Sequence, residues 1–295
     1  MKRILVVGDR GMLGTDLMEL LASKAGPSGE TPGLKVRGID LPEIDITHRA
    51  SINRALREFR PRVVVNCAAY TRVDDAEKNL DLAMQVNGIG PGLLAAGCAV
   101  ARARLVHLST DFVFDGAKPS PYEEDDPTGP LSAYGATKLE GERRVAGAGG
   151  DWLIVRTAWL YGEHGKNFVT TIRELARTKP ELTVVNDQRG CPTWTRDLAR
   201  ALWALMNTDA HGIVHAVGRG TCTWYEFACE IVKLSALSTP VRPVPSAEFK
   251  RPARRPANSA LDTSRLKGLT GFEFPLWQDS LAAFLAELDA AGGPI

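Results

Sequence analysis

The chain has 295 residues, and its 36 lysines and arginines nearly balance 35 aspartates and glutamates, which gives a formal charge of +1. A near-neutral chain lacks the positive charge that attracts nucleic acids and anionic membrane surfaces, so neither partner is expected. The five cysteines form no C-x-x-C pair and no metal-binding spacing with the five histidines, which predicts reduced thiols, a cytoplasmic protein and no metal site.

Predicted strands and helices alternate through the first half of the chain. Residues 3–8 form a continuous apolar run that ends at Gly8, typical of a strand buried on both faces. Further strands are predicted at 34–40, 62–69, 104–110 and 152–160, and helices at 12–24, 47–59 (with Thr47 as N-cap), 79–100 and 134–147. This alternation predicts an α/β fold with a Rossmann-type, doubly wound parallel sheet. The first strand follows no apolar signal sequence, and no segment is expected to span a membrane.

The second half is less regular. Helices are predicted at 167–178, 195–207 and 223–237, between short strand-like pieces and a proline-rich loop at 242–259. We expect a dinucleotide-binding domain over 1–160, joined by some later segments that return to the sheet. Residues 161–295 are expected to form mainly a smaller C-terminal α/β substrate-binding lobe.

The turn "GDRGMLG" places Gly8, Gly11 and Gly14 after a buried strand and at the start of a helix. This is the context of a dinucleotide fingerprint, in which glycine permits a tight turn and close approach of a pyrophosphate to the helix N-terminus. Asp40 follows the second strand, where a carboxylate binds ribose hydroxyls and favours NADH. Arg10 favours NADPH, because a guanidinium can bind a 2′-phosphate. The sequence slightly favours NADPH and leaves NADH open.

Other residues are expected beside the cofactor because of their places in the fold. They are Met12 and Leu13 in the turn, Asp45 and Ile46 near the adenine, and Ala68, Ala69, Tyr70 and Thr71 after the third strand. Asn87 is either a hydrogen-bond partner of these strand ends or an exposed amide.

Three further residues suggest ketone reduction. Thr110 ends a parallel strand, at the edge where open α/β sheets bind ligands. Tyr134 and Lys138 are four residues apart on a predicted helix and share one face. Tyr134 is expected to donate a proton, with its pKa lowered by the Lys138 ammonium and the oxidised nicotinamide, while Thr110 polarises the substrate carbonyl.

The segments "GDRGMLG", "NCAAYTRVDDAE", "STDFVFDG", "SAYGATKLEGE", "VRTAWLYG", "NDQRGCPTW" and "RPANSALD" resemble, in order, the extended short-chain dehydrogenase/reductases. More narrowly they resemble the dTDP-4-dehydrorhamnose reductases, which reduce dTDP-4-dehydro-L-rhamnose with NAD(P)H. The resemblance implies a catalytic triad of Thr110, Tyr134 and Lys138, with Tyr134 and Lys138 also touching the cofactor. It places Val73, Asp111, Phe112 and Trp159, with Thr110 and Tyr134, around the sugar, and Arg255 and Asn258 near the nucleotide.

Several alternatives stay open at this point. The chain can reduce another dTDP-4-keto-deoxysugar, act as an epimerase or dehydratase of the same fold, or be a catalytically silent dinucleotide-binding regulatory subunit. Some related enzymes hold a divalent ion at a dimer contact, but no acidic cluster is evident in this sequence. A homodimer is compatible with the sequence. Trp159 can alternatively pack in the core. The basic run at 250–255 can alternatively be a solvated surface loop.

Overall fold

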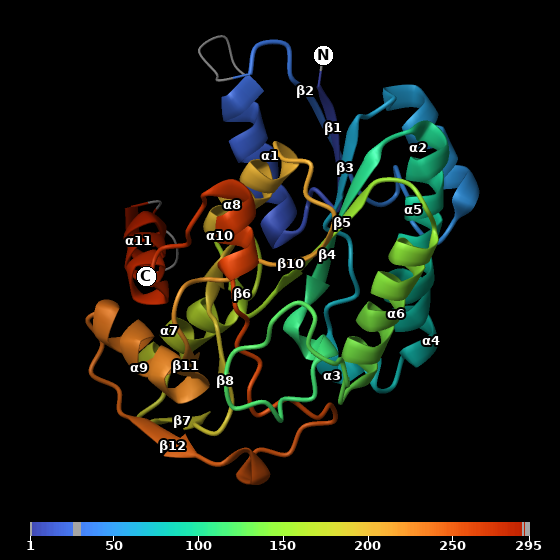
Figure 1. The fold of residues 1–295 in the computed structure, drawn as a ribbon. Coiled ribbons are helices and arrows are strands. Elements are labelled where there is room, and N and C mark those ends of the chain that lie inside the picture. Colours follow the sequence, from blue (N-terminus) through green and yellow to red (C-terminus); the bar gives the residue numbers. More distant parts are fainter. Residues whose placement is uncertain (1, 26–30, 291, 293–295) are drawn as a thin grey trace.

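The structure is a computed structural model that describes residues 2–25, 31–290 and 292. At its centre is a six-stranded parallel sheet in the order β10-β5-β4-β3-β1-β2 (Figure 1). The strands are β1 (Arg3–Val7), β2 (Lys35–Ile39), β3 (Val63–Asn66), β4 (Arg104–Thr110), β5 (Trp152–Thr157) and β10 (Gly212–His215). The predicted doubly wound fold is confirmed.

Helices cover both faces of this sheet because successive strand residues point to opposite faces. Ile4 and Val6 face a core shared with α1 (Met12–Ala25), α8 (Thr195–Met206) and α10 (Ser264–Thr270). Leu5 and Val7 face the other core, with α2 (Arg49–Phe59), α5 (Gly90–Ala101) and α6 (Ala133–Gly147). Figure 1 shows these two helix layers on either side of the strands.

The start of α2 differs from the prediction. Its N-cap is His48 and not Thr47, and His48 makes no capping hydrogen bond with its side chain. The Thr47 hydroxyl donates instead to Asp45 Oδ1 at 2.7 Å, as the Thr47 amide does at 2.8 Å. Thr47 therefore closes a short turn before the helix. Such local hydrogen bonds compete with helix capping for the threonine side chain.

One continuous helical stretch matches the helix predicted at 79–100 but contains a π-helical segment. It consists of α4 (Leu80–Ala83), a π-helical segment (Met84–Ile89) and α5. By length and mean hydropathy, Leu80–Ala101 is compatible with a membrane span, contrary to the expectation from sequence. Half of its most apolar window is buried inside the protein, and α5 packs on α2 and α6. A core helix explains this composition.

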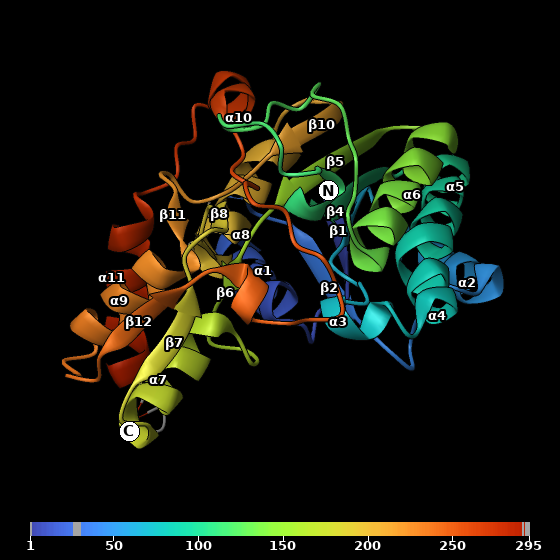
Figure 2. The ribbon, with the colours of Figure 1, turned by 90° about the horizontal axis from the view of Figure 1, so that it is seen from below.

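The remaining elements form a smaller α/β lobe beside the sheet (Figure 2). Its helices are α7 (Phe168–Thr178), α9 (Trp224–Leu234) and α11 (Trp277–Ala290). Its strands are β6 (Leu160–Tyr161) with β9 (Thr193–Trp194), β7 (Leu182–Val185) with β12 (Val241–Val244), and β8 (Arg189–Gly190) with β11 (Cys222–Thr223). A short helix, α3 (Val73–Ala76), follows β3.

Candidate active site

The glycine turn after β1 leaves no room for larger side chains. Gly8 has φ +81°, and a Cβ on it would lie 2.7 Å from the Ala68 amide nitrogen. A Cβ on Gly14 would lie 2.1 Å from the Gly8 carbonyl oxygen. Glycine at these two positions lets α1 begin directly against the turn, so that its free N–H groups face the carboxyl edge of the sheet. This cradle fits the pyrophosphate of a dinucleotide.

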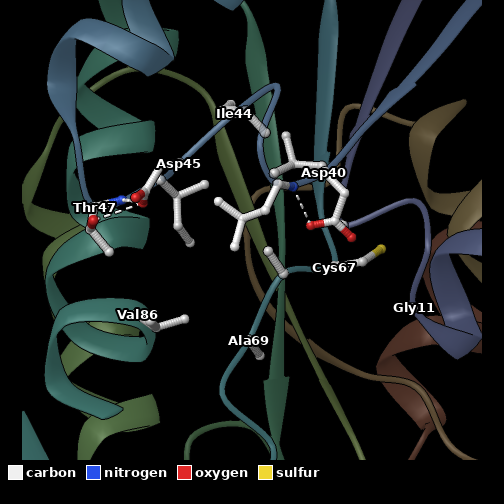
Figure 3. Close-up of a pocket in the computed structure, with 13 residues that line it drawn as sticks. Gly11, Asp40, Ile44, Asp45, Thr47, Cys67, Ala69 and Val86 are labelled. Atoms are coloured by element: carbon white, nitrogen blue, oxygen red, sulfur yellow. Dashed lines mark hydrogen bonds between the residues drawn. The ribbon is translucent and has the colours of Figure 1, made fainter. Parts of the chain in front are cut away.

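A hollow beside this turn collects many of the predicted cofactor residues (Figure 3). Those lining it are Gly8, Gly11, Asp40, Asp45, Ile46, Ala68 and Ala69. The hollow is also lined by residues that were not predicted beside the cofactor, namely Val7, Leu41, Ile44, Thr47, Cys67 and Val86. The side chains of Ile44, Ile46 and Val86 give the hollow an apolar wall, as an adenine ring requires.

Two of the predicted turn residues have other neighbours. Leu13 is buried in the core between the sheet and α1. Met12 lies against Gly162, since a Cβ there would be 3.1 Å from Met12 Cγ. Their placement beside the cofactor stays a prediction.

Acidic groups surround Arg10. Its guanidinium donates to the Leu41 carbonyl at 3.0 Å and to Glu43 Oε1 at 3.3 Å, while most of the side chain is exposed. Loss of water and the nearby Asp40 carboxylate raise the pKa of Asp9. The Asp40 carboxylate accepts from the Leu41 amide at 2.7 Å. Arg10 and Asp40, the two residues used to predict cofactor preference, therefore lie in the same region, and a second carboxylate, Glu43, accepts a hydrogen bond from the arginine.

Asn87 is buried and joins two segments of the site. Its Oδ1 accepts from the Tyr70 amide at 2.8 Å, and its Nδ2 donates to the Tyr70 carbonyl at 3.0 Å and to Thr137 Oγ1 at 3.3 Å. The predicted hydrogen bond to the end of β3 is confirmed, and the exposed-amide alternative is wrong. The Tyr70 hydroxyl donates to Asp75, and Thr71 is exposed.

Thr110 and Tyr134 lie at the carboxyl edge of the sheet. The Thr110 hydroxyl donates to Asp111 Oδ1 at 2.9 Å and accepts from the Phe112 amide at 3.2 Å. The Phe112 ring packs edge-on against Tyr134, with centroids 5.6 Å apart. The structure thus brings Thr110, Asp111, Phe112 and Tyr134 together, as expected from the sequence.

The pKa of Tyr134 moves against the expectation from sequence. Although the ring keeps some exposed surface, removal of water from its hydroxyl raises the pKa to about 12. A hydrogen bond with Thr110 opposes this shift, and the Asp111 charge adds to it. Burial also raises the pKa of Asp111 to about 6. Tyr134 is consequently a phenol at neutral pH, the form able to donate a proton.

Lys138 is buried one helical turn after Tyr134. Its ammonium donates to the Leu108 carbonyl at 2.6 Å, two residues before Thr110. Burial lowers the pKa of Lys138 to about 8, while the Glu142 carboxylate raises it. Below about pH 8 the lysine is an ammonium ion, and its charge acts on Cys67, which lines the cofactor hollow.

Trp159 has an unusual backbone and packing. Its φ is +48°, and its ring stacks on Trp224 with centroids 3.5 Å apart and planes 5° apart. Gly190 packs against the ring, because a Cβ there would lie 2.3 Å from Trp159 Cε2. The side chain is only partly buried. Its expected sugar contact, like that of Val73 at the start of α3, stays a prediction.

The proline-rich segment returns from the lobe to α3. Arg255 donates from Nη1 to Asp74 Oδ1 at 3.0 Å and from Nη2 to Asp74 Oδ2 at 2.8 Å. Asn258 donates to the carbonyls of Lys118 and Ser120 and accepts from the Ala260 amide. Nucleotide contacts of Arg255 and Asn258 stay predictions; the polar atoms of Asn258 are engaged by main chain.

Among the described residues, one group with metal-ligand chemistry was not predicted from the sequence. Ligand atoms of Asp16, Glu19 and His164 lie within 4.8 Å of one another. Burial raises the pKa of Asp16, and Arg196 Nε lies 3.8 Å from its Oδ1. Asp16 and His164 are 148 positions apart in the printed numbering, so spacing along the chain gave no signal for this group.

The parallel sheet, the glycine turn and the Thr110–Tyr134–Lys138 edge define an NAD(P)-dependent oxidoreductase of the extended short-chain dehydrogenase/reductase class. A family model described as the RmlD substrate binding domain matches residues 1–290. The chain belongs to this family, whose members include dTDP-4-dehydrorhamnose reductases and other dTDP-sugar 4-ketoreductases.

Individual relatives are similar over nearly their whole length. A dTDP-4-dehydrorhamnose reductase of Streptomyces griseus is 45% identical over 303 residues, covering 99% of this chain and 96% of that protein. A probable dTDP-4,6-dihydroxy-2-methyloxan-3-one 4-ketoreductase of Streptomyces antibioticus is 43% identical over 297 residues, covering 99% and 97%. The crystal structure of a Bacillus anthracis dTDP-4-dehydrorhamnose reductase in complex with NADP has a TM-score of 0.90 and 36% identity, covering 97% and 100%.

Proposed function

We propose that this protein reduces the 4-keto group of dTDP-4-dehydro-L-rhamnose with NADPH or NADH and so forms dTDP-L-rhamnose. The observation that carries the proposal is the set of contacts at the carboxyl end of β4: Phe112 touches both Thr110 and Tyr134, and Lys138 binds the Leu108 carbonyl. The 45% sequence identity to a dTDP-4-dehydrorhamnose reductase, over nearly the whole of both chains, supports the choice of sugar.

The cofactor residues fit a dinucleotide because the Gly8–Gly14 contact leaves the helix N-terminus open to a pyrophosphate. The walls of the hollow would hold the adenosine half, and Lys138 would bind the nicotinamide half. When bound, the reduced nicotinamide supplies the hydride for C4 of the sugar.

The chain itself supplies orientation and a proton. When the ketone binds, the Thr110 hydroxyl turns from Asp111 Oδ1 and donates its hydrogen bond to the carbonyl oxygen at C4, which stabilises the charge that develops there. The raised pKa of Tyr134 keeps its phenol protonated until the alkoxide forms, and the phenol then donates its proton to that oxygen. The Lys138 ammonium, one turn further along the same face of α6, stabilises the tyrosinate left behind.

A direct assay tests the substrate. The protein is incubated with dTDP-4-dehydro-L-rhamnose and NADPH, and cofactor oxidation at 340 nm is compared with the amount of sugar product. We expect one cofactor oxidised for each dTDP-L-rhamnose formed. Conversion of the sugar without cofactor oxidation would identify an epimerase, and binding of NADPH without conversion of any keto-sugar would identify a silent subunit.

A second candidate is a reductase for a different dTDP-4-keto-deoxysugar. The 43% identity to the Streptomyces antibioticus relative is nearly as high as that to the S. griseus protein, and it favours testing a panel of such sugars. A higher kcat/KM for another member of the panel would assign that sugar instead. Action in the cytoplasm belongs to the same proposal and follows from the nucleotide-linked substrate.

A further inference from the structure

A buried ion pair lies under the helix that carries Tyr134 and Lys138. Glu142 Oε2 accepts from Arg156 Nη2 at 2.7 Å, and Glu142 Oε1 accepts from Arg156 Nε at 2.9 Å. The two side chains are 4% and 3% exposed. A two-point pair of this kind has a fixed geometry, because the planar guanidinium matches the carboxylate.

The same carboxylate also binds the strand that ends in Thr110. Ser109 Oγ donates to Glu142 Oε1 at 2.5 Å. Ser109 pairs with Arg156 in the register between β4 and β5. Glu142 therefore ties α6 to both strands immediately beneath Thr110.

Tyr134, Lys138 and Glu142 follow one another at intervals of four residues on α6, so they share one face of the helix. The face meets β4 at two neighbouring residues, because Lys138 donates to the Leu108 carbonyl and Glu142 accepts from Ser109. Displacement of Glu142 would thus move the lysine relative to the strand end.

The charges around Lys138 come from four elements. His107 on β4 is buried and neutral, since burial and the lysine lower its pKa well below the ordinary value. Burial raises the pKa of the Cys67 thiol, after β3, to about 12, so it too is neutral. Arg156 on β5 is paired with Glu142 on α6.

Two further groups near the helix face act on Tyr134. The Asp111 carboxylate raises the pKa of that tyrosine, and the Thr110 hydroxyl opposes it. The pKa of Lys138 is raised by Glu142 and by Cys67. Because Cys67 is an uncharged thiol at neutral pH, Glu142 is the one of these two groups that carries a negative charge.

We propose that Glu142 is a positioning residue for Lys138: its carboxylate, fixed by Arg156 and Ser109, holds this face of α6 against β4 and so seats the lysine on the Leu108 carbonyl. The charge of Glu142 also favours the ammonium form of Lys138. The inference rests on the role proposed for Lys138 in the reaction. It differs from a purely structural role, in which Glu142 would only fasten α6 to the sheet. A structural fastener affects stability but not the pH at which Lys138 loses its proton.

The test compares Glu142→Gln with Ser109→Ala. The first variant removes the charge with little change of shape, and the second removes a hydrogen bond to the same carboxylate but keeps its charge. The dissociation constant of NADPH, measured by fluorescence, and kcat/KM are followed from neutral to alkaline pH. Thermal unfolding midpoints are recorded for both variants and the wild type.

We expect the wild type to lose cofactor affinity and kcat/KM above about pH 8. In Glu142→Gln the midpoint of this alkaline loss should move to a pH about one unit lower. Above the new midpoint, kcat/KM should be roughly tenfold lower than in the wild type. Ser109→Ala should lower the unfolding midpoint and leave the limb in place. Equal limbs in all three proteins, or the same shift in both variants, would overturn the proposal.

The outcomes separate this inference from the proposed function. A wild type that reduces the keto-sugar but has no alkaline limb near pH 8 would reject the role of Glu142 and Lys138 while keeping the reaction. A wild type with the limb in NADPH binding but no turnover of that sugar would reject only the substrate. If Glu142→Gln does not fold, Arg156→Lys is used instead: it keeps a cation beside Glu142 but removes the two-point geometry that fixes the carboxylate, and an alkaline limb identical to that of the wild type would overturn the proposal.

Discussion

Asp74 and Arg255 form a two-point ion pair between α3 and the proline-rich segment, although they are 181 residues apart in the chain. The Ala253 amide donates to the same carboxylate, and Arg251 Nη1 lies 3.8 Å from it. The hydrogen bond from Arg255 is the main cause that lowers the pKa of Asp74. The pair holds the proline-rich segment against the loop that follows β3, where the sugar nucleotide is expected.

Replacing Asp74 by Asn should release Arg255 and loosen this segment. We expect KM for the sugar nucleotide to rise by about tenfold with a smaller change in kcat, since an unanchored segment must be ordered during binding. Steady-state kinetics at saturating NADPH measure both constants. Asp81→Asn, an exposed position on α4, is the matched control and should be neutral. An unchanged KM in Asp74→Asn would show that the pair does not shape the substrate site.

Replacing Tyr134 by Phe should remove the proton donor. We expect kcat to fall by about 10²- to 10⁴-fold, the usual contribution of a positioned acid, while NADPH affinity changes little. Single-turnover oxidation of NADPH and fluorescence titration measure the two quantities. Near-normal turnover would mean that another group, or water, donates the proton.

The Arg10–Glu43 pair offers a test of cofactor preference. Replacing Arg10 by Ala should weaken NADPH binding more than NADH binding if the guanidinium meets the 2′-phosphate. Glu43→Gln should do the reverse and favour NADPH, because it frees the arginine from its carboxylate. The ratio of the two dissociation constants is the measurement. Equal effects on both cofactors would show that Arg10 serves only the loop after β2.

Replacing Gly14 by Ala should abolish NADPH binding or destabilise the fold. The added Cβ would meet the Gly8 carbonyl oxygen at 2.1 Å, a distance that forces the turn to move. Gly268→Ala in α10 is the matched control, since nothing lies within 4 Å of its Cβ. The control should be neutral or stabilising by about 0.5–1 kcal/mol. NADPH titration and thermal unfolding of both variants provide the comparison.

Replacing Asp111 by Asn should stabilise the protein at neutral pH while it impairs activity. The folded pKa of about 6 lies above the ordinary 3.8, so the folded state binds more protons between these values and stability falls as pH rises through that window. Removing the charge should recover on the order of 3 kcal/mol above pH 6 and little below pH 4. Denaturant unfolding at both pH values measures the difference. Equal stability of the two proteins at neutral pH would show that hydrogen bonds compensate the buried carboxylate.

Local patterns were enough to predict the sheet and the central part of the site. Thr110 could be placed because parallel strands align their carboxyl ends, and Tyr134 and Lys138 because a four-residue spacing fixes a helix face. Contacts between distant segments were beyond this reasoning, as Asp74–Arg255 and Glu142–Arg156 show. The same limit applies to Cys67 and Leu41 in the cofactor hollow, and the pKa of Tyr134 depends on burial that no spacing reveals.

The strand β10 has a consequence for engineering the family. It lies at one edge of the cofactor sheet beside β5, although about fifty residues of the smaller lobe separate the two in the chain. A fragment ending at residue 160 would lose this strand together with α8, and would expose the edge of β5 and the apolar core that α8 shares with α1. Exchange of the smaller lobe between relatives would therefore have to leave residues 195–215 in place, because a simple C-terminal swap would also replace part of the central sheet and its covering helices.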